Sequence, residues 1–169
     1  MGQLWNSRKI ALLSVMTALA MILSYVESLI PVFFGVPGMK LGLTNLLVVF
    51  ALYRWGGREA LIVNFMRILL TGFLFGNPYS IAYSLSGGFL SLAGMAFLKR
   101  TGLFSVIGVS MAGGILHNAG QIGVAIGVTD NYRLIHYFPV LLLTGCLTGF
   151  LIGILSDELL RRIGRVREG

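Results

Sequence analysis

An arginine stands near the middle of the third apolar stretch of this sequence. Asn64, Arg67 and Thr71 are spaced at i, i+3 and i+7, so on a helix they form one polar stripe. Arg at the centre of a membrane helix costs ~2.5–3.5 kcal/mol, so it usually faces the protein interior and has a partner. Its guanidinium can hold a carboxylate, a phosphate or another acceptor on a ligand. The alternative is a structural pair with Glu27 or with helix-end carbonyls.

A second group of polar side chains lies in the fifth apolar stretch. His117 and Gln121 are one helical turn apart, Asn118 adjoins them, and glycines leave space beside the backbone. The group either lines a pocket or forms hydrogen bonds between helices, which are worth about 0.6 kcal/mol per pair in a membrane. No second histidine stands at ligand spacing, so we expect no metal here.

Small residues form a smooth face on the first apolar stretch, where Ala11, Ser14 and Ala18 are spaced at i, i+3 and i+7. Such a face is either buried within the bundle or docks another membrane protein. Spacing alone favours internal packing. Two further polar sets could complete a pocket wall: Ser24, Glu27 and Ser28 in the first stretch, and Tyr79, Tyr83 and Ser86 in the fourth.

The residues that several kinds of enzyme need are missing. Asp130 and Asp157 are the only aspartates, so no aspartate-rich pair can hold Mg²⁺ on a diphosphate. The sequence contains no phosphate-binding loop, no dinucleotide fingerprint and no GxSxG motif. We therefore expect a protein that is not an enzyme and has no cofactor, and we expect any use of ATP to come from a partner.

The candidate polar groups described above lie in six apolar runs of the sequence, at 10–30, 41–54, 58–75, 79–98, 103–128 and 134–156. Lipid cannot satisfy the polar groups of a backbone, so runs of this kind must form helices. With 56% hydrophobic and 11% charged residues, a chain of 169 residues leaves no room for a soluble domain. The sequence predicts an all-α integral membrane protein, folded as a single compact six-helix bundle over 1–169.

Basic residues mark one side of the membrane. Ten of the thirteen Lys and Arg residues lie at alternating gaps and ends: Arg8, Lys9, Arg54, Arg58, Lys99, Arg100, Arg161, Arg162, Arg165 and Arg167. Because Lys and Arg are retained on the cytoplasmic side, both termini are predicted to be cytoplasmic in the cell membrane. The net charge of +7 therefore follows topology, and we expect contact with membrane lipids and not with nucleic acid. The one cysteine, Cys146, excludes a disulfide within the chain.

The longest outward connection, 31–40, is apolar and is interrupted by Pro and Gly. We expect a shaped loop over the mouth of the bundle, called here the gating loop, with Pro31, Phe33, Phe34, Pro37, Gly38 and Met39. The run after it, 41–53, covers only about 20 Å as a helix, against about 30 Å of hydrocarbon. The loop is therefore expected to dip into the protein, with the second helix beginning below the outer surface.

Two small-xxx-small faces predict close helix packing within the chain in preference to a homodimer: Gly145, Gly149 and Gly153 in the sixth run, and Ala119, Gly123 and Gly127 in the fifth.

The segment Pro37-Gly-Met-Lys-Leu-Gly-Leu-Thr-Asn-Leu46, between an apolar first helix and a third helix with a central Arg, resembles one known family. These are the small membrane proteins called heptaprenyl diphosphate synthase component I, or Gx transporters, and the similarity covers nearly the whole chain. The family is similar to the substrate-binding S components of energy-coupling factor (ECF) transporters. Those have six helices, cytoplasmic termini and a long first outer loop over the substrate pocket. The resemblance implies that Ser14-xxx-Ala18 matches the Ala-xxx-Ala face that docks a transmembrane coupling subunit with its ATPases.

Together, the residues and the resemblance predict an S-component-like protein that captures a small molecule outside and helps to move it inward. Arg67 and Lys40 would meet an anionic group, with polar contacts from Asn45, Asn64, His117, Asn118 and Gln121. Relatives lie near isoprenoid, quinone and flavin-linked electron-transfer genes, which implies an anionic or lipophilic substrate related to redox or isoprenoid chemistry. Three alternatives stay open: a subunit of a quinone or prenyl enzyme complex, a non-transporting scaffold or electron-transfer accessory, and a self-sufficient carrier or channel.

Overall fold

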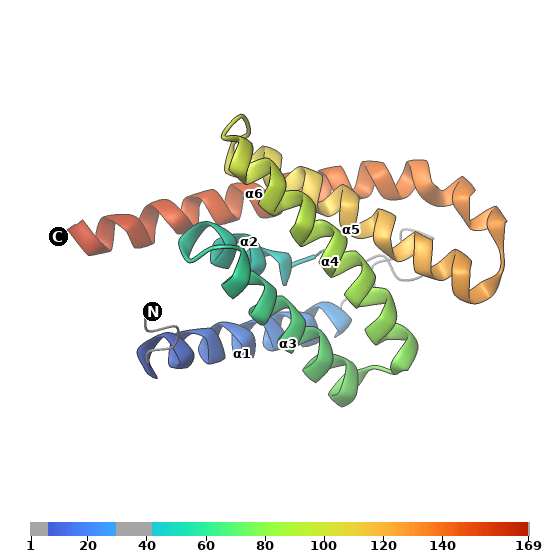
Figure 1. Ribbon diagram of the computed structural model, residues 1–169, viewed down its shortest axis with the longest axis horizontal. Coiled ribbons are helices and arrows are strands. Elements are labelled where there is room, and N and C mark those ends of the chain that lie inside the picture. The colour runs from blue at the N-terminus through green and yellow to red at the C-terminus, as the bar shows by residue number, and fades with distance from the viewer. Residues whose placement is uncertain (1–6, 30–41, 169) are drawn as a thin grey trace, which may run out of the picture.

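The computed structural model describes residues 7–29 and 42–168, with side chains described up to residue 163. The gating loop and Lys40 lie outside the described residues. Six α-helices follow one another along the chain: α1 (Ser7–Leu29), α2 (Asn45–Arg54), α3 (Gly57–Phe75), α4 (Pro78–Thr101), α5 (Val106–Thr129) and α6 (Phe138–Glu168). A short 3₁₀ helix, η1 (Tyr132–Tyr137), precedes α6 (Figure 1). The predicted all-helical fold with six helices is confirmed.

Three segments of the described chain are long and apolar enough to cross a membrane: α1, α4 and the segment Tyr132–Ile163. α2 is apolar but has only ten residues, so the prediction of a short second helix is confirmed. That the chain crosses the membrane six times, and that both termini are cytoplasmic, stay predictions.

Three predicted helix boundaries differ from the observed ones by four residues or more. One is the start of α6, which lies at Phe138 and not at residue 134, because Tyr132–Tyr137 form the 3₁₀ helix η1. α2 begins at Asn45 and not at residue 41, because Gly42 has a φ of 75° and the Asn45 amide donates to the Gly42 carbonyl in a turn. α6 continues to Glu168, far beyond the predicted end at 156. On this polar extension Arg161 pairs with Asp157 and Arg162 with Glu158, and such i,i+4 pairs support an exposed helix.

Five of the helices close into a ring. α3 packs on α4, α4 on α5, α5 on α6, α6 on α2 and α2 on α3, while α1 lies against α3 on the outside of the ring (Figure 1). The short α2 supplies much of the apolar core, since Val48, Val49, Ala51 and Leu52 are almost completely buried. The beginning of α2 therefore lies near the centre of the ring. There Asn45 faces a small cavity that residues of α4, α5 and α6 also line.

Glycines bring α5 and α6 into backbone contact. A Cβ atom at Gly145 would lie 2.7 Å from the Gly114 carbonyl oxygen, and one at Gly149 would lie 2.6 Å from that of Ser110. The predicted packing of the α6 face within the chain is confirmed. The prediction for Gly123 and Gly127 is wrong, because both are exposed and a Cβ there would meet nothing within 4 Å in the described chain. On α5 the α6 face contacts a different set, Ser110 and Gly114.

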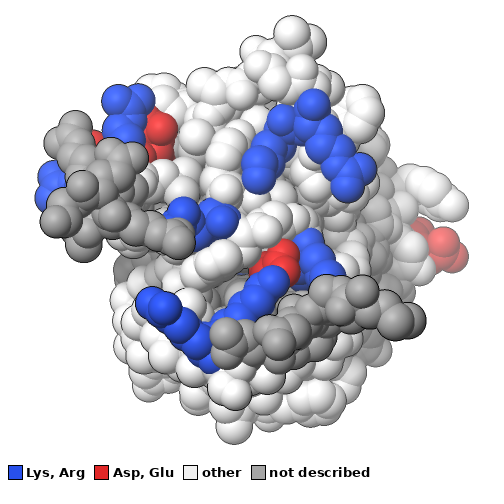
Figure 2. Space-filling view, turned by 60° about the vertical axis from the view of Figure 1, so that its left-hand side comes forward, with Lys and Arg blue, Asp and Glu red and all other residues white. Residues whose placement is uncertain are grey.

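Most of the basic residues of the described chain gather at one end of the molecule, apart from Arg67 in α3 and Arg133 on η1 (Figure 2). The N-terminus, the C-terminus and the turn between α2 and α3 lie at the same end in Figure 1, and Figure 2 shows the Lys and Arg side chains collected there. Two of these lysines also join helices: Lys9 Nζ lies 2.5 Å from Glu59 Oε1, and Lys99 Nζ donates to the Leu52 carbonyl at 2.6 Å. This one-sided distribution is the pattern on which the predicted orientation rests.

Candidate functional site

Arg67 and its two neighbours on α3 form one hydrogen-bonded group. Nε and Nη2 of Arg67 both donate to Asn64 Oδ1, at 3.2 and 2.9 Å, and Thr71 Oγ1 donates to the Arg67 carbonyl at 2.6 Å. Both Asn64 and Arg67 are buried, with exposed fractions of 3% and 9%. The predicted polar stripe is therefore confirmed.

The packing of α4 holds Asn64 in place. A Cβ atom at Gly88 would lie 2.8 Å from Asn64 Nδ2, so only a glycine leaves room for this amide between α3 and α4. Asn64 takes the edge of the guanidinium made by Nε and Nη2. The other Nη hydrogens of Arg67 donate to no residue that the structure describes, and they stay available for another acceptor.

Glu27 on α1 lies near enough to Arg67 for an electrostatic interaction, and a structural pair of the two stays an open alternative. This carboxylate is itself buried, with 5% exposed, and its Oε1 accepts a hydrogen bond from the amide of Gly42. A hydroxyl pair one turn earlier, Ser24 Oγ and Thr44 Oγ1 at 2.9 Å, makes a second link to the same turn. Glu27 and Ser24 therefore hold the segment that leads into α2.

A pocket of about 240 Å³ opens beside this group, between α1, α3 and the beginning of α4, at the end of the bundle away from both termini. We call it the Arg67 pocket. Besides Arg67 its polar lining consists of hydroxyls and one amide: Ser24, Tyr25, Ser28, Thr71, Asn77, Ser80 and Ser84. The rings of Tyr25 and Phe75 lie 5.0 Å apart and form an aromatic wall. The pocket thus combines a buried cation with many hydrogen-bonding groups.

The α4 side of the Arg67 pocket is formed by Asn77, Ser80 and Ser84 and not by the predicted Tyr79, Tyr83 and Ser86. Asn77 caps α4 in a reciprocal pair with Ser80, in which Asn77 Oδ1 accepts from the Ser80 amide and Ser80 Oγ accepts from the Asn77 amide. Ser84 lies one turn further along the same face. The i,i+4 spacing of the two serines beside a capping asparagine was the available signal, but a helix start explains these residues equally well.

The polar group of α5 lies on the other side of α4 from Asn64 and outside the Arg67 pocket. A Cβ atom at Gly87 would lie 2.8 Å from both Gln121 Cγ and the His117 carbonyl oxygen, so Gln121 and His117 pack on α4. Asn118 Nδ2 donates to the Leu141 carbonyl in α6 at 2.6 Å. Asn118 therefore makes a hydrogen bond between helices, one of the two predicted alternatives. A contact of these three residues with substrate stays a prediction.

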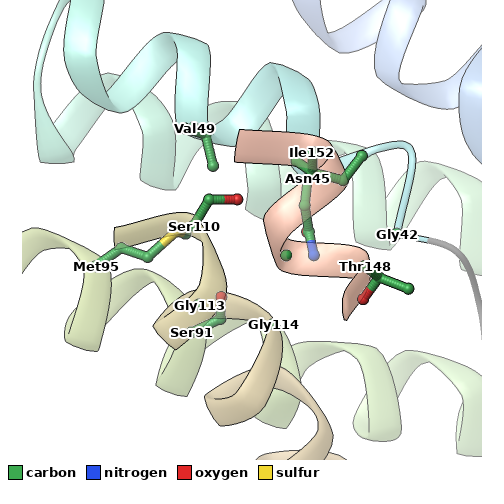
Figure 3. A pocket seen from close by; sticks show the side chains of 11 residues that line it. Gly42, Asn45, Val49, Ser91, Met95, Ser110, Gly113, Gly114, Thr148 and Ile152 are labelled. Carbon is green, nitrogen blue, oxygen red and sulfur yellow. The ribbon is translucent and has the colours of Figure 1, made fainter. Parts of the chain in front are cut away.

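Asn45 lies in a different place again, in a small cavity between α2, α4, α5 and α6 (Figure 3). Ser91, Ser110 and Thr148 bring hydroxyls to this cavity, and Gly113, Gly114 and Gly149 form part of its wall. The predicted substrate contacts of the described chain are thus divided between the Arg67 pocket, the α4–α5 contact and this central cavity.

The small-residue face of α1 is not buried. Ala11, Ser14 and Ala18 are all exposed, so the expected packing of this face within the bundle is wrong. Ser14 and Ala18 line an apolar groove of about 410 Å³ between α1 and α3. Internal packing uses the neighbouring face of α1 instead, with Leu13, Met16 and Ala20 in the core.

Among the residues that the structure describes, no three His, Cys, Asp or Glu side chains come together as candidate metal ligands.

A model of the family described as heptaprenyl diphosphate synthase component I matches residues 16–159. Curated proteins and solved structures give no match to this chain.

Proposed function

The chain belongs to the heptaprenyl diphosphate synthase component I family, and from this membership together with the Arg67 pocket we propose a membrane protein that binds a small anionic molecule. It captures this molecule at the outer side and helps to move it inward, in the manner of an S component. It is not a catalyst by itself. The gating loop would cover the pocket, and Lys40 would add a second positive charge.

One observation carries this proposal: a buried arginine whose position is fixed by a neutral partner. Burying a guanidinium is unfavourable unless its charge is compensated. Asn64 satisfies one edge of Arg67 without neutralising it, and Glu27 offers its carboxylate also to the amide of Gly42. An anionic group in the Arg67 pocket would meet the remaining Nη donors, while Tyr25 and Ser84 offer hydroxyls to its other oxygens.

Transport inward needs a partner, and the groove beside Ser14 and Ala18 suits a transmembrane helix. Small side chains let another helix approach closely, and the groove is apolar and exposed. An ECF-type coupling subunit with ATPases would dock there and supply the energy. The ligand would be an anionic or lipophilic molecule of redox or isoprenoid chemistry.

The family description supports a second candidate function, a non-catalytic membrane subunit of a prenyl diphosphate synthase. In that case the same groove would hold a synthase subunit, and the pocket would present an anionic substrate to it. Co-purification of a catalytic subunit with product formation would favour this function. Uptake by the purified chain alone in liposomes would instead favour a self-sufficient carrier.

The experiment is a thermal-stability and binding screen of purified protein against small organic carboxylates, phosphate esters and matched neutral amides. We expect anions to raise the melting temperature of the wild type, and neutral amides not to. Arg67→Lys should stay folded and weaken binding by roughly 1.5–3 kcal/mol, because an ammonium cannot reproduce the two fixed donors.

Arg67→Met separates a ligand contact from a structural ion pair. If Arg67 binds a ligand, Arg67→Met stays folded, losing no more stability than its hydrogen bonds to Asn64 supply, and it loses the response to anions, which Glu27→Gln does not restore. If Arg67 serves only to pair with Glu27, Arg67→Met is destabilised by a buried uncompensated carboxylate, and Glu27→Gln partly rescues the fold. A well-folded Arg67→Met that responds to anions like the wild type would refute the proposal.

A further inference from the structure

The central cavity contains a hydroxyl without a protein partner. Ser91 on α4 is only 2% exposed, and its Oγ makes no hydrogen bond with any residue that the structure describes. Buried hydroxyls in folded proteins are nearly always hydrogen-bonded, to protein or to ordered water. α5 packs closely against Ser91 here, since a Cβ atom at Gly113 would lie 3.2 Å from Ser91 Oγ.

Other polar groups converge on the same space. Ser110 on α5 is 3% exposed, and Figure 3 shows its hydroxyl and the amide of Asn45 pointing into the cavity that Ser91 also lines. Thr148 on α6 donates its hydroxyl hydrogen to the Gly145 carbonyl at 3.3 Å, so its oxygen can only accept within the cavity. Donors and acceptors from four helices therefore surround one small volume.

The small volume of the central cavity limits what it can bind. Its volume for a water-sized sphere is about 10 Å³, close to the ~10–15 Å³ that a single buried water requires. A cation is disfavoured because α2 begins at this cavity with the positive end of its dipole, and because the described lining includes no carboxylate.

We propose that this cavity binds one ordered water molecule, which bridges Ser91 of α4 and Ser110 of α5 to Asn45 at the beginning of α2. Buried waters of this kind make about three hydrogen bonds to polar groups that otherwise have no partner. The water fixes the beginning of α2 from inside the ring, while Glu27 and Ser24 hold the preceding turn from α1. It is a structural ligand, and its presence does not depend on the proposed function of the Arg67 pocket.

The sign of one stability change tests this proposal. A buried hydroxyl without a partner is unfavourable, so its removal should raise the melting temperature. Removal of a hydroxyl that holds a bridging water should instead lower the melting temperature. We expect Ser91→Ala and Ser110→Ala each to lower the melting temperature. The double variant should lose less than the sum of the two, because each single variant already disturbs the same water.

Ser156→Ala is the matched control, because Ser156 is fully buried, has no hydrogen-bond partner in the described chain and lies outside the cavity. We expect its melting temperature to be unchanged or raised. A raised melting temperature for Ser91→Ala, or additive losses for Ser91→Ala and Ser110→Ala, would overturn the proposal. The wild type and Ser91→Ala should also be compared in NaCl and in choline chloride. If NaCl raises the melting temperature of the wild type but not that of Ser91→Ala, the cavity binds sodium and the proposal of a water is overturned.

Discussion

Asn64 accepts two hydrogen bonds from Arg67 through one oxygen atom, with Nε at 3.2 Å and Nη2 at 2.9 Å. The two residues are three positions apart on α3, so the helix itself brings them to the same face. Asn64 therefore aims the guanidinium without neutralising its charge. This arrangement supports the proposal that Arg67 contacts the ligand and that Asn64 positions it.

Substitutions of Asn64 should separate positioning from charge. Asn64→Leu removes the acceptor and should lower the stability of the fold by roughly 1.5–3 kcal/mol, the usual value of a hydrogen bond to a charged group, while also weakening anion binding. Asn64→Asp keeps an acceptor of the same shape, so we expect it to fold well. Its carboxylate would neutralise Arg67 and abolish the response to anions. Thermal unfolding and anion titration of both variants check this, and unchanged anion binding in Asn64→Asp would contradict it.

The glycine contacts predict opposite effects on stability for two glycine-to-alanine substitutions, one on α6 and one on α5. Gly149→Ala puts a methyl group 2.6 Å from the Ser110 carbonyl oxygen, so the two helices must separate and the melting temperature should fall. Gly127→Ala meets nothing within 4 Å and replaces a poor helix former, so it should be neutral or stabilising by up to about 1 kcal/mol. Equal losses in both variants would show that the exposed face of α5 is covered by something else.

The local features of this fold were predictable from the sequence, and the long-range ones were not. Six helices, a short α2 and the Asn64–Arg67 group depend on apolar run lengths and on spacing within one helix. The choice of packing face on α5 does not, because Gly114 and Gly123 both belong to acceptable small-residue patterns. Only the approach of α6 decides between them.

The candidate site shows the same limit. Arg67 and Thr71 were found together because they share a helix, whereas Ser80 and Ser84 reach the pocket only through the packing of α4 on α3. Ser14 and Ala18 have the spacing of a packing face, but spacing does not reveal whether a neighbouring helix is present. In this chain none of the described helices covers them, and they remain exposed.

The orientation of the bundle can be measured by labelling in intact cells. In a Cys146→Ser background, single cysteines at Gly35 and Asn131 should react with a membrane-impermeant thiol reagent from outside. Cysteines at Gly57 and Thr101, which lie at the basic end, should react only after the membrane is opened. The reverse pattern would invert the topology and place the Arg67 pocket on the cytoplasmic side.

A large side chain placed in the exposed groove on α1 should block the docking of a partner there. Ala18→Trp fills the groove without entering the core, so we expect a folded protein that binds anions normally and no longer co-purifies with the proposed coupling subunit or synthase subunit. Leu143→Trp on α6 is the control, because Leu143 is 72% exposed and lies away from the groove. Loss of folding in Ala18→Trp, with Leu143→Trp intact, would show that the α1 face packs internally.

Native mass spectrometry of the detergent-purified protein tests the Arg67 pocket most directly. We expect wild type to retain one small anionic species per chain, and Arg133→Met, which alters an exposed arginine on η1, to retain it equally. Arg67→Met should retain at least about tenfold less, because a loss of 1.4 kcal/mol or more corresponds to that factor. Equal retention by a well-folded Arg67→Met would contradict the assignment of this pocket as the binding site.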